Sequence, residues 1–303
     1  MPCSRTILLG RFALLLVLGS GLLAAQAPKH DKPFWRGVAE HRYEVPNGES
    51  ASALAHELSR LLASSDPELR DDLAYSILAR WIGRPGILQP DDLLALADKW
   101  MSNLKDGIGE SGTNSVLKRS FSALCLSLIA EREAKTPFLG TSNYHQLVTA
   151  AVTYLQTERD LRGYDAKVGW IHATAHTSDL LQALAANALL KSEEESSILD
   201  AMATRLASAP EVYTQGEQDR MAQAVLALIR RADFAADSFE TWLTRLEAED
   251  KKVWDVPLTP ESLAHYQNHT YILQALSVRL DLEPDSPKIT AVKRRVLGML
   301  RNR

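Results

Sequence analysis

Cysteine is nearly absent from this chain, whose 303 residues contain two, Cys3 and Cys125. Cys3 lies in a stretch with the features of a secretory leader, so the rest of the chain has one thiol and no intramolecular disulfide is expected. Cys125 stands in the apolar run Phe121-Ser-Ala-Leu-Cys-Leu126, where cysteine acts as a small hydrophobic side chain. We therefore expect Cys125 to be a core residue and not a reactive nucleophile.

Motifs that identify several common enzyme classes are also missing. The chain has no G-x-S-x-G, no P-loop and no C-x-x-C, so the usual hydrolase, nucleotide and thioredoxin-like interpretations lose their support. Its formal net charge of −4 provides no basic field, and we expect no nucleic-acid partner. No alternating apolar run is long enough to predict a β-strand.

The N-terminal residues have the pattern of a secretory signal. Arg5 and Arg11 form a positive region, an apolar run begins at Phe12, and Ala24-Ala-Gln-Ala27 supplies the small residues of a cleavage site. We expect residues 1–27 to be a signal peptide and the protein to be periplasmic or secreted, with no membrane span after signal removal. The apolar run is shorter than the roughly 20 residues that a span needs. Proline after the expected cut is unfavourable, so an uncleaved anchor stays open.

Beyond the leader, the sequence divides into a short polar segment and one long helical region. Residues 28–48 are expected to be an extended N-terminal segment, anchored by Phe34 and Trp35. From residue 49 to residue 303 the apolar residues recur every three or four positions, which predicts amphipathic helices in a single domain. Capping residues and Pro or Gly breaks divide this region into about eleven helices. Helix starts are indicated at Ser65-Asp-Pro-Glu68, Gln89-Pro90, Thr259-Pro260 and Ser286-Pro287.

Internal repetition gives the fold prediction. Five segments that resemble one another, each preceded by another amphipathic helix, recur at a spacing of roughly 45–55 residues. They start at Glu68, Ser115, Gly169, Gln218 and Asn268. Because one helical pair cannot bury its apolar stripe alone, we predict an all-α fold of HEAT/armadillo-like stacked helical hairpins, an α-solenoid. An irregular helical bundle is the alternative. A closed ring of hairpins, as in some glycan-active enzymes, is a further possibility. A glycan-active enzyme needs paired catalytic carboxylates, and the sequence does not single out such a pair.

The most unusual polar stretch runs from Glu158 to Leu181. Its first half is a charged loop with two glycines, and a helix is expected to open near Gly169 or Trp170. At about 100° per residue, three polar residues of that helix would lie on one stripe along its flank. These are His172, His176 and Asp179. In stacked hairpins such a flank often faces the concave groove.

Three interpretations of this stripe stay open. His172, His176 and Asp179 have a spacing that can bind a divalent metal such as zinc, which would make the protein a metal-dependent hydrolase acting on envelope material. However, Ala173 stands where zinc proteases of the H-E-x-x-H type have their general base. The same side chains can instead form a hydrogen-bond network that only satisfies buried polar groups. The third interpretation is ligand binding.

Ligand binding is the leading prediction. Hairpins stacked in register would gather several polar residues on one concave wall, where arginines can pair with carboxylates or other anions. We expect this groove to bind a peptide, a protein or a small anionic ligand without a cofactor; whether the protein is an enzyme stays open. The predicted binding residues are Arg70, Asp71, Arg119, Asp160, Arg162, His172, His176 and Asp179.

Parts of the chain resemble a bacterial family known as domain of unknown function 2785. The hallmark is carried by Arg159-Asp-Leu-Arg-Gly-Tyr164 and by Gly169-Trp-Ile-His-Ala-Thr-Ala-His-Thr-Ser-Asp179. Asp66-Pro-Glu-Leu-Arg-Asp-Asp72 and Arg119-Ser-Phe-Ser-Ala-Leu124 are similar to its two upstream signatures. The likeness extends from about Phe34 to beyond Leu184. It implies a helical, HEAT-like domain and no established activity, so it assigns no catalytic residues.

Overall fold

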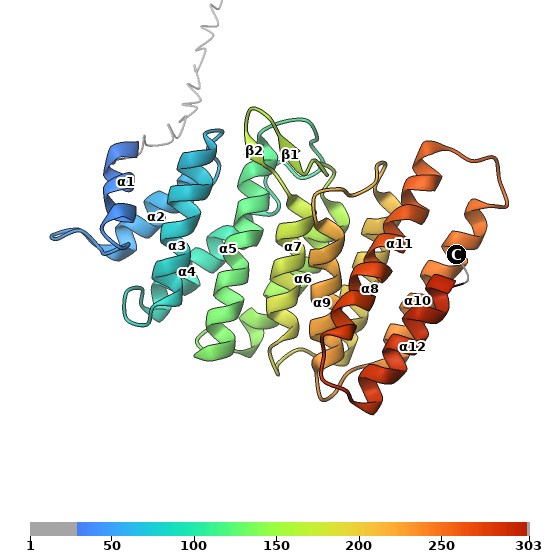
Figure 1. Ribbon diagram of the computed structural model, residues 1–303. Helices are drawn as coiled ribbons and strands as arrows, with labels where there is room; N and C mark the ends of the chain where they lie inside the picture. Colours follow the sequence, from blue (N-terminus) through green and yellow to red (C-terminus); the bar gives the residue numbers. More distant parts are fainter. Residues whose placement is uncertain (1–28, 302–303) are drawn as a thin grey trace, which may run out of the picture.

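A computed structural model describes residues 29–301 of the chain. The predicted signal peptide, residues 1–27, lies outside the described residues. Within them the fold is all-α, as the sequence predicted: twelve α-helices and one π-helix (η1) are accompanied by two short strands (Figure 1). The sequence predicted about eleven helices.

The elements follow one another with short connections. In chain order they are α1 (Lys32–Glu40), α2 (Ala51–Leu61), η1 (Glu68–Tyr75), α3 (Ser76–Gly83), α4 (Pro90–Asn103), α5 (Ser115–Lys135), α6 (Gly140–Thr157), β1 (Tyr164–Asp165), β2 (Gly169–Trp170), α7 (Ala173–Ala185), α8 (Ser192–Ser208), α9 (Glu217–Arg230), α10 (Ala236–Val253), α11 (Pro260–Asp281) and α12 (Pro287–Arg301).

The helices form two rows. In the first row, η1 continues into α3, and α3, α5, α7, α9 and α11 each pack against the next; in the second row, α6 packs against α8 and α8 against α10. Figure 1 shows the succession from α1 at one end to α12 at the other. The five segments that resemble one another in the sequence all fall in or directly before helices of the first row. We call this first row the inner row.

The core lies between and within the rows. Helix α5 is buried over most of its surface because α3, α4 and α7 pack around it. Fully buried tryptophans fill the larger spaces: Trp35, Trp81, Trp100 and Trp242. The indole N–H of Trp100 donates to Ser59 Oγ at 2.8 Å, because a buried indole needs an acceptor. In residues 29–301, no helix combines the length and the apolar character needed to cross a membrane.

The segment 28–48, expected to be extended, contains a helix. Residues Lys32–Glu40 form α1, and the Asp31 carboxylate caps it by accepting the backbone N–H of Phe34 at 3.0 Å. Proline in the first turn fits such a start, because its missing N–H has no partner there. Trp35 is fully buried, so its predicted anchoring role is confirmed although the prediction of extended backbone is wrong.

The helix expected to open near Gly169 begins at Ala173 instead. Gly169–Trp170 pairs with Tyr164–Asp165 as a small antiparallel hairpin, in the register Tyr164↔Trp170. His172 then adopts left-handed backbone angles (φ 53°, ψ 33°) immediately before the helix. His172 is therefore not on the helical stripe of His176 and Asp179, and the predicted three-residue stripe is wrong.

Candidate functional site

The eight predicted binding residues do not gather on one concave wall. Four of them fasten the polar loops at one end of the inner row, two histidines lie at the start of α7, and Asp71 is next to a buried arginine. Of the eight, Asp179 alone lines the open groove described below.

Arg119 is a structural residue. Its side chain is fully buried, and Nε and Nη2 donate to the two carboxylate oxygens of Glu158 at 2.6 and 3.1 Å. Nη1 donates to the backbone carbonyls of Asp106 and Gly107 at 3.0 and 2.9 Å. Arg119 thus ties α5 to the end of α6 and to the loop before α5. A guanidinium engaged in this way is not available to a ligand.

Arg70 holds the hairpin β1–β2 against η1. Its fully buried guanidinium donates to the carbonyls of Val168 at 2.7 Å and Trp170 at 3.1 Å, and to that of Ser64 at 2.9 Å. The adjacent Asp71 carboxylate lies 2.7 Å from Arg70 Nε. Burial raises the pKa of Asp71 to about 6, although the Arg70 charge acts in the opposite direction.

Asp160 and Arg162 join two loops. The buried Asp160 carboxylate accepts the backbone N–H of Gly112 at 2.9 Å and pairs with Arg162, whose Nη2 also donates to the carbonyl of Thr113. The fastened loop contains Gly107-Ile-Gly-Glu-Ser-Gly112, a G-x-G-x-x-G string that the sequence reasoning passed over. Because it connects α4 to α5 and follows no strand, it lacks the context of a dinucleotide site. Asp160 and Arg162 also line a hollow of about 430 Å³.

His176 is neutral and fixed in one tautomer. The hydroxyl of Ser120 donates to the carbonyl of Ile171, so Nδ1–H of His176 donates to Ser120 Oγ at 2.8 Å. Burial, followed by the charges of His172 and Arg220, lowers the pKa of His176 well below its ordinary value.

His172 is held by the loop before α9. Its Nε2 lies 3.0 Å from the carbonyl oxygen of Gln215 and 3.4 Å from a carboxylate oxygen of Glu217. A carbonyl can only accept, so Nε2 is the protonated donor. The ring stacks on Trp170 with centroids 4.7 Å apart. Both histidines therefore have protein partners that explain their positions.

The geometry does not favour the metal-dependent hydrolase. His172, His176 and Asp179 bind separate partners, and Asp179 pairs with Arg220 Nη1 at 2.5 Å. In the described part of the chain, no three His, Cys, Asp or Glu side chains are placed to hold one metal ion.

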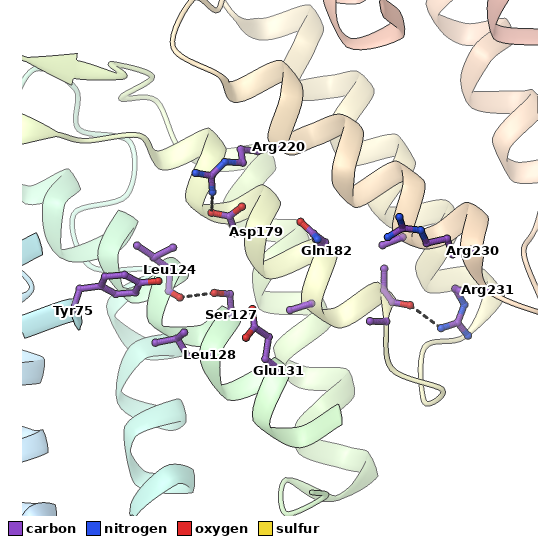
Figure 2. A pocket seen from close by; sticks show the side chains of 14 residues that line it. Tyr75, Leu124, Ser127, Leu128, Glu131, Asp179, Gln182, Arg220, Arg230 and Arg231 are labelled. Atoms are coloured by element: carbon purple, nitrogen blue, oxygen red, sulfur yellow. Dashed lines mark hydrogen bonds and ion pairs between the residues drawn. The ribbon is translucent and has the colours of Figure 1, made fainter. Parts of the chain in front are cut away.

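An open groove crosses the inner row instead. It has a volume of about 590 Å³ and is bordered by side chains of η1, α5, α7 and α9 (Figure 2). Alanines at the end of α7, directly after it and in α9 form its floor: Ala183, Ala185, Ala186 and Ala227. Small floor residues keep the groove open where the helices pack closely. We call this the inner groove.

The cations of the inner groove are already paired. Arg220 binds Asp179, and Arg230 binds Glu283 at 2.5 Å. Arg231 is buried, pairs with Glu195 at 2.8 Å and donates to three backbone carbonyls. Burial raises the pKa of Asp179, whereas its ion pair with Arg220 acts to lower it.

Three polar groups in the inner groove have no hydrogen-bond or ion-pair partner within residues 29–301: the hydroxyl of Tyr75, the carboxylate of Glu131 and the side-chain amide of Gln182. Figure 2 shows Tyr75, Glu131 and Gln182 around the same opening. The sequence reasoning missed all three. Tyr75 lies within the first of the five similar segments, whereas Glu131 lies beyond the end of the second, so the repetition did not mark these residues as a group.

Two other hollows differ in character. One is the hollow at Asp160 and Arg162, which lies among loops. The other, of about 950 Å³, lies between α4 and α6 in the outer part of the fold and has an apolar floor that includes Met101, Leu104 and Ala150. The larger hollow also has polar side chains without a partner among the described residues, Asp98 and Lys105 among them. The inner groove differs in that such groups come from three consecutive helical units of the inner row.

The comparison with protein families identifies the chain. The sequence model described as "Protein of unknown function (DUF2785)" matches residues 104–278, which include α5, α7 and α9, and the chain belongs to this family. The match starts later than the likeness seen in the sequence, which reached back to Phe34. No curated protein and no solved structure matches the chain.

Proposed function

We propose that this protein binds an extended peptide segment of a partner protein in the inner groove. The observation that carries the proposal is an open groove of about 590 Å³ across consecutive helices, with hydrogen-bonding groups that have no partner in the fold. An extended backbone presents amide donors and acceptors that need such partners. The Gln182 amide offers both a donor and an acceptor, and the Tyr75 hydroxyl does so as well.

The dimensions agree with a short peptide. Neighbouring packed helices are about 10 Å apart, so a ligand from α5 to α9 crosses about 20 Å. At about 3.3 Å per residue, this distance corresponds to about six extended residues. The alanine floor allows the backbone of such a segment to approach the helices.

A small anionic ligand is less well supported. Arg220, Arg230 and Arg231 are engaged by Asp179, Glu283 and Glu195, so an anion would have to compete with carboxylates already in place. The predicted anion-binding arginines Arg70 and Arg119 are fully buried in structural contacts.

We also propose that the helices form an α-solenoid and that the protein is periplasmic or secreted. The two rows, with five similar segments in one of them, support a HEAT/armadillo-like α-solenoid, a class that uses extended surfaces for binding. The leader predicted in residues 1–27 supports a periplasmic or secreted protein. The partner would then be a protein of the same compartment.

The test is selection from a random hexapeptide display library with the immobilised protein. Ala186→Tyr fills the groove with a neutral side chain at the exposed position that directly follows α7, and Ala291→Tyr makes the same change on the exposed surface of α12. We expect selected peptides to bind Ala186→Tyr at least about tenfold more weakly, which is about 1.4 kcal/mol. They should bind Ala291→Tyr as they bind the wild type. Equal binding to Ala186→Tyr and the wild type would overturn the proposal.

A further inference from the structure

We infer that the inner groove selects peptides with a lysine or arginine, and that Glu131 is the residue that recognises the basic side chain. This inference rests on the proposed function and specifies its ligand.

The charges of the groove provide the first argument. Each guanidinium that lines it has a carboxylate partner, and the carboxylate of Asp179 is used by Arg220. Glu131 is the remaining charged group of the lining, and no cation within residues 29–301 pairs with it. An arriving cation therefore gains an ion pair without breaking one. An arriving carboxylate would have to displace an existing partner.

The neighbours of Glu131 provide the second argument. Leu124 and Leu128 lie on the same helix and line the same groove, where they offer apolar contact to the aliphatic stem of lysine or arginine. Tyr75 lies beside Leu124 and Leu128 at the same edge of the groove (Figure 2), and an aromatic ring attracts a cation. A carboxylate, an aromatic ring and two leucines together match both parts of a basic side chain.

The electrostatics of Tyr75 agree with this assignment. Burial is the main reason that the pKa of Tyr75 is raised; Cys125, Asp179 and Glu131 raise it further, whereas the charge of Arg220 lowers it, so both carboxylates are near enough to act on the hydroxyl.

The test repeats the hexapeptide selection with charge variants of the groove. Peptides selected by the wild type should be enriched in Lys and Arg, and their affinity for Glu131→Gln should fall by about two- to fivefold, as for loss of an exposed ion pair. Glu131→Lys should instead select peptides enriched in Asp and Glu. Glu193→Gln, at an exposed position of α8, removes the same charge elsewhere and should keep the Lys and Arg preference.

The outcomes separate this inference from the proposed function. Peptides that bind the wild type and are blocked by Ala186→Tyr, but show no Lys or Arg excess or keep it in Glu131→Gln, would overturn the inference alone. Peptides that bind Ala186→Tyr as tightly as the wild type would overturn the proposed function and the inference with it.

Discussion

The guanidinium of Arg119 and the carboxylate of Glu158 form a two-pronged ion pair in which both side chains are almost completely buried, with exposed fractions of 0% and 3%. The pair connects the middle of the inner row to the polar loop that follows α6. The loop residues that were predicted from the sequence to bind a ligand thus hold the loops against the inner row. The groove to which we assign peptide binding lies farther along the same helices.

Breaking this pair should strongly destabilise the protein. We expect Glu158→Gln to lower the free energy of unfolding by about 3–5 kcal/mol, because Arg119 would stay buried without a counter-ion. The pair of Arg295 and Glu240, which is largely exposed, provides the control, and Glu240→Gln should cost less than about 1 kcal/mol. Urea denaturation of both variants measures the difference. Similar losses for the two would contradict the assigned role.

Burial of His176 should make the fold sensitive to acid. Its pKa is lowered in the folded state, so the stability that it contributes is present above the ordinary histidine pKa of about 6.5 and is lost as the pH falls below that value. One such group changes the unfolding free energy by up to about 1.4 kcal/mol per pH unit. His176→Asn keeps a donor for Ser120 and cannot titrate. We expect its stability between pH 7 and pH 5 to fall less steeply than that of the wild type; identical slopes would refute this.

Asp71 should have the opposite pH dependence. Its pKa is raised from 3.8 to about 6, so its contribution is present below pH 3.8 and is lost as the pH rises through about 6. Asp71→Asn cannot titrate, but it also leaves the buried Arg70 without its carboxylate, so we expect it to be less stable than the wild type, by a margin that shrinks as the pH rises from 4 to above 6. Asp72→Asn at the exposed neighbouring position is the matched control. A stability difference from the wild type that is the same at pH 4 and pH 7.5 would count against burial as the cause of the raised pKa.

Gly169 should be intolerant of a side chain. It has φ +74°, and an added Cβ would lie 3.0 Å from Pro67 Cβ. We expect Gly169→Ala to destabilise the protein by about 1–3 kcal/mol. Gly298 is the matched control, because it lies within α12 and an added Cβ meets no atom within 4 Å. Gly298→Ala should stabilise by about 0.5–1 kcal/mol. Thermal unfolding of the two variants would give shifts of opposite sign, and shifts of one sign would contradict the explanation.

Local sequence patterns predicted the helices well. Helix starts at Gln89-Pro90 and Thr259-Pro260 were readable because capping depends on residues within one turn; for example, Thr259 Oγ accepts the N–H of Ser262 at 3.1 Å. The recurrence of similar segments along the sequence also predicted that they would occupy equivalent positions, and they lie in one row of helices.

The candidate site was not predictable in the same way. Arg70 donates to carbonyls of residues 168 and 170, almost one hundred positions away, and this contact helps to hold the hairpin in place of the expected helical turn. A periodicity argument contains no information about such partners. The groove residues Tyr75, Glu131 and Gln182 look like ordinary surface residues in the sequence, and their importance depends on which neighbours leave them without a partner.

Hydrogen–deuterium exchange with and without a hexapeptide selected by the wild type tests the central claim most directly. The account predicts slower exchange in α5 near Glu131, α7 near Gln182 and α9 near Arg220, with no change in the hairpin Tyr164–Trp170. Protection confined to that hairpin, or to helices of the second row, would contradict it.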